Sequence, residues 1–276
     1  MYDPVISHTS PFIYNLRSQV VNGQTIYETS HNVAYELTTL QRRVLVRLTG
    51  GCGSLPDAQG AAMYQLFVDG FAGFNGAMLF GGTRMLRMPD NTEICPGITE
   101  VAPMILRANK DCRILGIVPL KTPPMVFDQR LGAVVEHNSE YTTIINPSQN
   151  YCLTIAASPD NGVIWEEEYK FCLQLTRLMR DRAKFRSVLV CYNGGDYTEQ
   201  ELLATADEGW PVLLIAGSGG QTEAYARNSL WLKQHPNVHS CEATAASLHQ
   251  ALVALKVLPA SKLAQVVSLP NRKVSA

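Results

Sequence analysis

Four Gly-Gly doublets constrain the fold of this chain more than any other feature of its sequence. They hold eight of the 20 glycines among the 276 residues, at Gly50-Gly51, Gly81-Gly82, Gly194-Gly195 and Gly219-Gly220. Each doublet comes just after a short apolar run such as Val44–Leu48. Glycine adopts positive φ and leaves no Cβ in a tight turn. A strand, a glycine turn and a helix, repeated along the chain, therefore predict βα units that form a mainly parallel sheet.

The predicted fold is a Rossmann-like α/β domain with helices on both faces of the sheet, preceded by a β-rich N-terminal extension. Residues 1–41 form the extension, because β-forming residues flank Asn22-Gly23, a pair that favours a type I′ hairpin turn. Residues 42–258 form the main domain and 259–276 a C-terminal tail. We expect strands at 44–48, 77–80, 113–118, 151–156, 187–192, 211–216 and 238–241, helices at 57–72, 98–109, 164–183, 198–208, 222–232 and 243–255, and loops with one strand (141–145) over 123–149.

The charge of the chain narrows the class of its partners. Lys and Arg number 23 and Asp and Glu 24, which gives a formal net charge of −1. A nucleic-acid polymer binds to a basic face, so we expect no such partner. No apolar stretch approaches the roughly 18 residues of a membrane span, and the first ten residues lack the pattern of a signal peptide. We therefore expect a cytoplasmic protein with no membrane partner.

Cysteine and histidine patterns predict no metal site. The 7 cysteines include no C-x-x-C pair, and none of the 6 histidines stands at ligand spacing with Cys or Asp. His235 and His239 are four residues apart, but Pro236 between them disrupts a helix. We expect no metal, no cofactor, and cysteines that are reduced in a reducing compartment.

The glycine turns are candidates for a phosphate site. The carboxyl ends of parallel strands meet at one edge of the sheet, where helix N-termini offer unpaired N–H groups and the positive end of the helix dipole. Any single doublet is better explained as a tight turn, whereas four of them favour a cradle of backbone N–H groups. Known motifs are incomplete. There is no Gly-Lys pair for a P-loop, and the sequences that begin G-x-G at Gly51 and Gly217 lack the final glycine of the dinucleotide-binding motif. Ser218 does not stand in the G-x-S-x-G motif of a hydrolase nucleophile.

Several stretches resemble the SLOG superfamily and, among its branches, the TRPM-like LSDAT domains. Val44–Ser54 is similar to the family's first strand and glycine turn. Ala77–Thr83 resembles its strand followed by Gly-Gly-Thr, and an insertion displaces the next helix start to Pro96–Glu100. Val188–Glu201 and Trp210–Gly220 resemble its run of two glycines, a helix, a G-x-P-V strand and Gly-Ser-Gly. The superfamily also contains the LOG phosphoribohydrolases and the DprA/Smf proteins.

The resemblance implies binding of a nucleotide-derived ligand such as ADP-ribose, in bacterial relatives often for stress or defence signalling. LOG enzymes instead cleave the base from a nucleoside monophosphate, using a G-G-x-G-T-x-x-E turn and a preceding Arg. Here Gly194–Glu201 keeps two glycines, Thr198 and the Glu but has Tyr197 in place of the third glycine. Arg180–Lys184 only loosely resembles the Arg-bearing helix. These departures count against glycosidic cleavage.

Several polar side chains have a structural as well as a functional interpretation. Thr198 and Glu201 either form a capping box at a helix start or bind a phosphate and a ribose hydroxyl, and Glu201 is also the carboxylate for glycosidic cleavage. Asp160 and Glu166–Glu168 suit the N-terminus of the long helix, with ribose binding as the alternative. Trp210, like Trp165, favours packing over base stacking.

The leading hypothesis is an intracellular sensor or binding module for a nucleotide-derived small molecule. The rival is a LOG-like phosphoribohydrolase or other N-glycosidic hydrolase with Glu201 as the catalytic residue, and a purely structural assembly protein is the third class. The N-terminal extension is a candidate contact of a homo-oligomer, and a separate effector protein is the other candidate partner. The predicted ligand-binding residues lie in the glycine turns and at the helix starts: Gly50, Gly51, Cys52, Gly53, Ser54, Gly81, Gly82, Thr83, Gly97, Thr99, Gly194, Gly195, Thr198, Gly217, Ser218, Gly219 and Gly220.

Overall fold

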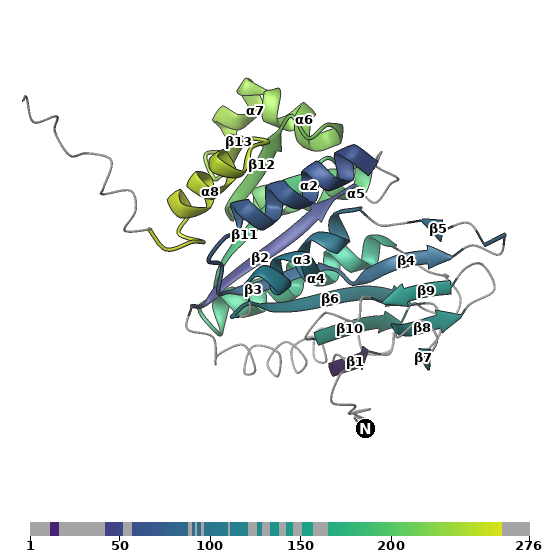
Figure 1. Cartoon of the computed structure of the whole chain (residues 1–276). Coiled ribbons are helices and arrows are strands. Elements are labelled where there is room, and N and C mark those ends of the chain that lie inside the picture. The colour runs from purple at the N-terminus through teal and green to yellow at the C-terminus, as the bar shows by residue number, and fades with distance from the viewer. Residues whose placement is uncertain are drawn as a thin grey trace, which may run out of the picture.

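Figure 1 shows the computed structural model of the chain. The structure describes residues 12–16, 42–51, 57–87, 90–91, 93–94, 97–109, 111–120, 126–128, 133–137, 142–145, 151–156 and 165–260. The predicted hairpin at Asn22-Gly23, the predicted ligand residues Cys52, Gly53 and Ser54, and residues 261–276 of the predicted tail lie outside these ranges.

An eight-stranded parallel sheet forms the centre of the described structure. Parallel strands are covered on both faces and are therefore apolar throughout, and every residue of β2 except the last is buried. In spatial order the strands are β1 (Phe12–Leu16), β10 (Tyr151–Ala156), β6 (Arg113–Leu120), β3 (Ala77–Gly81), β2 (Val44–Gly50), β11 (Arg186–Tyr192), β12 (Val212–Ala216) and β13 (Val238–Glu242).

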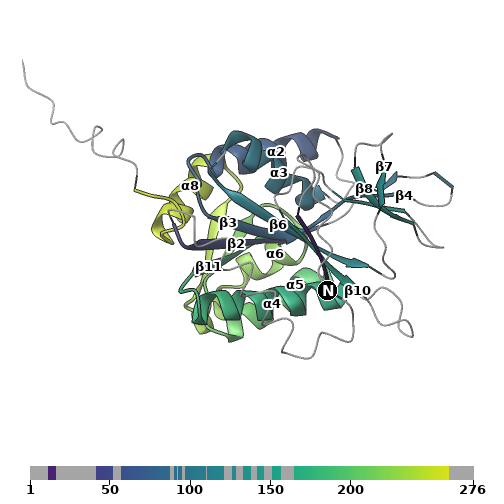
Figure 2. The same ribbon diagram turned by 90° about the horizontal axis from the view of Figure 1, so that it is seen from below.

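Helices cover both faces of this sheet, which Figure 2 shows edge-on. On one face lie α2 (Asp57–Gly70), the short 3-10 helix η2 (Gly97–Glu100), α3 (Val101–Ala108) and α8 (Ala245–Ala254), whose apolar side chains share one core with β2. On the other lie α4 (Trp165–Asp181), α5 (Asp196–Asp207), α6 (Gly220–Arg227) and α7 (Ser229–Gln234). The predicted Rossmann-like α/β fold with a parallel sheet is confirmed.

The order of the strands creates a switch point at the centre of the sheet. From β2 the chain moves outward through β3, β6 and β10, and then returns to the other side of β2 to add β11, β12 and β13. In open α/β sheets the ligand crevice lies where the strand order reverses, outside the carboxyl ends of the strands. Here that position is between the ends of β2 and β11.

A second, five-stranded antiparallel sheet differs from the sequence prediction. Its order is β5 (Glu93–Ile94), β4 (Thr83–Arg87), β9 (Thr142–Ile145), β8 (Ala133–His137) and β7 (Val126–Asp128). The strand expected at 141–145 is present as β9, but the expectation of loops elsewhere in 123–149 is wrong. Strands of two to five residues are too short to show the alternating pattern by which strands are recognised.

The predicted helix 222–232 is divided in two. It ends as α6 at Arg227, and Asn228 begins α7 by accepting a hydrogen bond on its Oδ1 from the Trp231 N–H at 3.0 Å. Asparagine is a preferred N-cap, so this residue starts a new helix instead of continuing the first. None of the helices within the described ranges is long and apolar enough to cross a membrane.

Candidate ligand-binding site

Glycine turns from three strands meet at the switch point. The Gly51 N–H, just after β2, donates to the Tyr192 carbonyl of β11 at 3.2 Å. The Asn193 N–H, just after β11, donates to Ser218 Oγ at 2.8 Å, in the turn after β12. The structure therefore brings together predicted ligand residues from three distant parts of the sequence.

Close approach of the backbone explains two of these glycines. Gly194 has φ of 89°, and a Cβ on it would lie 2.2 Å from Thr198 Oγ1. Gly220 has φ of 57°, and its Cβ would lie 2.3 Å from the Gly194 carbonyl oxygen. That carbonyl also accepts the Gln221 N–H at 2.9 Å. Protein atoms fill the space beside both glycines, so these two residues let the turns pack on each other.

The start of α5 is the open part of this edge. Gly195 is its N-cap residue and supplies no side-chain cap, and a Cβ on Gly195 would meet no atom within 4 Å. The first N–H groups of a helix have no partner within the helix. Tyr197 in this first turn is 54% exposed, whereas Thr198 beside it is buried. An uncapped helix N-terminus next to open space is a place where an anion can bind.

The start of α6, in contrast, is engaged within the protein. The Gly217 N–H donates to the Glu223 carboxylate. Both the N–H and the hydroxyl of Thr222 donate to the Asn193 carbonyl, at 3.2 and 2.6 Å. A phosphate at the predicted residues of this turn would compete with these internal bonds, and with the negative charge of Glu223.

The turn after β3 lies beside β2, on the side away from β11. The Gly82 N–H donates to the Ile117 carbonyl at 2.8 Å. A Cβ on Gly81 would lie 3.0 Å from Thr99 Cγ2 and 3.3 Å from Glu168 Oε1. The predicted residues that remain in this region are Gly97 and Thr99, both buried in η2, and Thr83 at the start of β4, whose side chain lies outside the described part.

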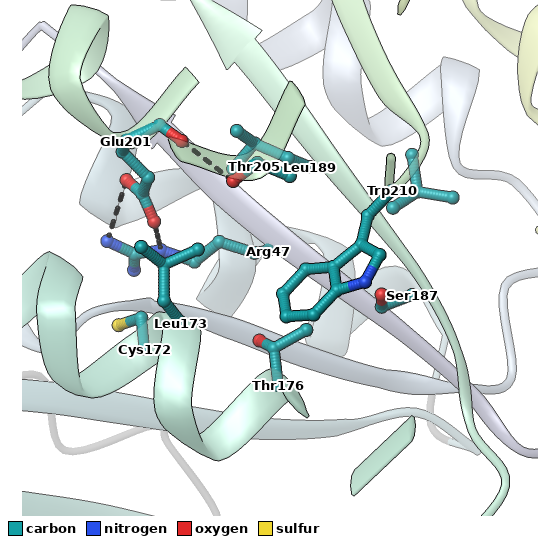
Figure 3. A pocket seen from close by; sticks show the side chains of 10 residues that line it. Arg47, Cys172, Leu173, Thr176, Ser187, Leu189, Glu201, Thr205 and Trp210 are labelled. Atoms are coloured by element: carbon teal, nitrogen blue, oxygen red, sulfur yellow. Dashed lines mark hydrogen bonds and ion pairs between the residues drawn. The ribbon is translucent and has the colours of Figure 1, made fainter. Parts of the chain in front are cut away.

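A buried ion group connects β2 to α4 and α5, and Figure 3 shows its pair of Arg47 and Glu201. The Arg47 Nε donates to Glu201 Oε1 at 2.7 Å, and its Nη2 donates to Glu201 Oε2 at 3.3 Å and to Glu168 Oε1 at 3.0 Å. The side chains of Arg47 and Glu201 are 9% and 3% exposed, and that of Glu168 is 16% exposed. Glu168 is therefore the member of the group that reaches toward solvent.

The charges within this group do not balance. One guanidinium faces two carboxylates, so the group carries one negative charge when all three residues are ionised. Burial raises the pKa of the Glu168 carboxyl above its ordinary value; Arg47 opposes this rise and Glu201 adds to it. Burial by itself lowers the pKa of Arg47, but the interactions of Arg47 with Cys172, Glu201 and Glu168 outweigh burial and raise this pKa above its ordinary value, so Arg47 stays charged. Burial also raises the pKa of the neighbouring thiols Cys172 and Cys191, which stay neutral.

A small cavity adjoins the ion group on the α4 and α5 side of the sheet. Its volume of 10 Å³ is at the limit for one water molecule. Arg47 Nη1 is buried here without a hydrogen-bond partner among the described residues. Trp210 lines the cavity and is buried, with the Arg180 Cζ 5.1 Å from its ring centroid, as expected of a packing residue. The cavity is too small to admit a nucleotide.

Two expectations about the acidic side chains are corrected by this geometry. The capping box is wrong, because Gly195 is the N-cap of α5 and the Glu201 carboxylate binds Arg47 instead of the helix backbone. Glu168 is not a solvated charge at a helix start, because Arg47 holds it against the end of β3. In both cases a cation from a distant strand outweighs the local helix preference.

Sequence reasoning missed Arg47. The sequence does mark this residue, because Arg47 is the only charged residue within the apolar run Val44–Leu48. A charged residue is almost never fully buried unless it is paired, so an Arg in the middle of a central strand predicts a buried carboxylate partner. Neither partner is near in sequence: Glu168 is 121 residues away and Glu201 154 residues away.

Comparison with solved structures found two molybdenum cofactor proteins among the similar chains. Among solved structures, the chain is similar to the molybdenum cofactor carrier protein of Chlamydomonas reinhardtii, with 16% identity, a TM-score of 0.47, and coverage of 78% of this chain and 99% of that one. It is also similar to the molybdenum cofactor binding protein of Rippkaea orientalis, with 13% identity, a TM-score of 0.47, and coverage of 78% and 99%. No curated protein matches the sequence.

The family match covers the carboxyl-terminal half of the fold. Residues 134–267 match the family model described as "SLOG in TRPM, prokaryote". This stretch contains α4, β11, α5, β12 and the Gly194 and Gly217 turns. The matched region is therefore similar to the prokaryotic TRPM-like branch of the SLOG superfamily, the branch that the sequence motifs resemble.

Proposed function

We propose that this protein is a binding module for a nucleotide-derived small molecule, of the ADP-ribose or cyclic-nucleotide kind. The ligand's phosphate lies at the start of α5, in the crevice between the ends of β2 and β11. One observation carries the proposal: the glycine turns meet at the switch point of the sheet, where Gly195 leaves open space over an uncapped helix start.

The backbone N–H groups at the start of α5 support a phosphate in this position, against the negative charge of Asp196 and Glu199 in the same turn. Helix N–H groups and the positive end of the helix dipole favour an anion by about 0.3–1 kcal/mol at an exposed site, and by up to about 2 kcal/mol when partly buried. Backbone donors of this kind need no basic side chains, which agrees with a net charge of −1. The match of residues 134–267 to the prokaryotic TRPM-like family model supports a sensing role in stress or defence signalling.

The state of Glu201 favours binding over glycosidic cleavage. A carboxylate that acts on a sugar must reach the reacting atoms. Glu201 is 2% exposed and both of its oxygens accept hydrogen bonds from Arg47. Its observed contacts hold α5 on β2, and we assign it this anchoring role. An assay for free base released from AMP or NAD tests the enzyme alternative, and turnover that disappears in Glu201→Gln would establish it.

Calorimetric titration with ADP-ribose, cyclic ADP-ribose, AMP and NAD tests the proposed function. The decisive variant is Gly195→Leu, because φ of −113° suits a side chain and no protein atom obstructs it, so only the ligand position is filled. Gly60→Leu in α2 is the matched control, since a Cβ there also meets nothing within 4 Å. We expect wild type and Gly60→Leu to bind one of these ligands and Gly195→Leu to lose binding while keeping its Tm. Flat titrations of the wild type, or full binding by Gly195→Leu, would defeat the proposal.

A further inference from the structure

Glu168 has one oxygen that the ion group does not use. Its Oε1 accepts a hydrogen bond from Arg47 Nη2. No hydrogen bond to Oε2 is found among the described residues, and the side chain is 16% exposed. The carboxylate lies beside Gly81, at the carboxyl end of β3, where a Cβ would be 3.3 Å from Oε1 and 3.7 Å from Oε2. A charged acceptor is therefore fixed at the same sheet edge as the start of α5.

The charge at this end of the edge is unsuited to a phosphate. Arg47 balances only one of the two carboxylates, and Glu201 takes two of its three hydrogen bonds. The Gly82 N–H, which would be a donor for a phosphate, is already bonded to the Ile117 carbonyl. A phosphate beside Glu168 would thus meet a like charge and lose a backbone donor.

We propose that Glu168 binds the sugar hydroxyls of the ligand whose phosphate lies at the start of α5. This inference rests on the proposed function and gives the ligand an orientation, with phosphate toward β11 and a vicinal diol toward β3. A carboxylate accepts hydrogen bonds from hydroxyl donors and makes them stronger than neutral acceptors do. The ligand class is therefore a ribose phosphate that keeps its free 2′- and 3′-hydroxyls.

The spacing of the strands fits this orientation. β2 lies between β3 and β11, and its Gly50 is in register with Tyr192 of β11. Neighbouring strands are about 4.8 Å apart, so the ends of β3 and β11 are separated by roughly 10 Å. That separation matches the scale of a sugar and its phosphate lying across the end of β2. A Cβ on Gly50 would lie 2.2 Å from the Tyr192 carbonyl oxygen, so this glycine lets the ends of β2 and β11 lie close together under the middle of the ligand.

The test compares AMP, 2′-deoxy-AMP and 2′,3′-dideoxy-AMP by calorimetry on wild type and Glu168→Gln. Gln keeps one carbonyl oxygen for Arg47 and turns an NH₂ donor toward the ligand. Since a hydrogen bond to a charged group contributes about 1.5–3 kcal/mol, wild type should bind AMP roughly 10- to 100-fold more tightly than the dideoxy analogue. In Glu168→Gln this ratio should fall close to one, while affinity for the dideoxy analogue stays within about threefold of wild type. Glu208→Gln, which removes the carboxylate of an exposed pair with Arg177, is the control and should keep the wild-type ratio.

The outcomes separate this inference from the proposed function. If wild type binds AMP and its dideoxy analogue equally well, or if Glu168→Gln keeps the preference, the diol assignment is refuted while the phosphate site stands. If wild type binds none of the probes and none of the four ligands above, the proposed function itself fails. A Tm for Glu168→Gln within a few degrees of wild type shows that any loss of preference does not come from unfolding.

Discussion

Replacing Arg47 by Met tests whether the buried ion group is the anchor of the fold that the structure indicates. Met keeps most of the aliphatic stem but leaves the carboxylates of Glu168 and Glu201 without their cation. Removing one partner of a buried ion pair costs about 3–5 kcal/mol, since the remaining charge is buried without compensation. For a chain of this size each kcal/mol shifts Tm by about 2–4 °C. We therefore expect the Tm of Arg47→Met to fall by roughly 10 °C.

The assay is urea unfolding followed by far-UV circular dichroism and by tryptophan fluorescence, whose transitions must coincide for a free energy to be defined. Arg47→Met combined with Glu201→Leu and Glu168→Leu should recover more than half of the lost free energy of unfolding, because a buried ion group replaced by apolar residues is often neutral. Arg227→Met is the control: its side chain is 78% exposed and pairs with Glu223, so less than about 1 kcal/mol is at stake. If Arg47→Met lowers the free energy of unfolding by less than about 1 kcal/mol, the anchoring role is refuted.

Two further predictions concern pH and a buried hydroxyl. Because the folded state raises the pKa of Glu168, ionisation of this residue opposes folding, so wild-type stability should fall as pH rises from the ordinary Glu pKa through the raised value. In Glu168→Gln this dependence of stability on pH should be weaker, as measured by the midpoints of urea unfolding over the same pH range. An unchanged dependence would contradict the prediction. Thr222 is fully buried and its hydroxyl donates to the Asn193 carbonyl at 2.6 Å, so Thr222→Val should lower the free energy of unfolding in urea by about 1–2 kcal/mol. The comparison variant is Thr244→Val, which removes only the exposed cap of α8. Equal stability of Thr222→Val and wild type would refute the prediction.

The sequence pattern predicts the sheet well because each βα unit carries its own signal. An apolar run such as Val212–Ala216 marks a strand, and the glycine turn after it marks the strand's carboxyl end. The antiparallel sheet could not be found in this way. Its strands are too short for alternation to identify them, and β4 pairs with β9, where the paired residues Arg87 and Thr142 are far apart in the sequence. The division of α6 from α7 depends on Asn228 alone, which the helical pattern around it obscures.

The predicted site residues fall into groups that only three-dimensional structure separates. Gly194 and Gly220 lie side by side because their turns pack together, and the space beside them is filled by protein. Gly195 follows Gly194 directly, yet the space beside it is open. Gly194 and Gly195 belong to one doublet in the sequence, and the sequence spacing cannot show which of the two has room for a ligand. Arg47 and its two carboxylates were equally hidden, because their pairing depends on contacts over more than 120 residues.

The ion group and the open space beside Gly195 are parts of one arrangement. Arg47 lies at the centre of the sheet and binds one carboxylate from α4 and one from α5. The proposed phosphate site is the first turn of α5, and the proposed acceptor for the sugar is Glu168 in the first turn of α4. A buried ion group contributes little net stability compared with an apolar core, so stability alone does not account for it. Its effect is to hold α4 and α5 at a fixed distance across β2, and in the proposed complex this distance separates the two ends of the ligand.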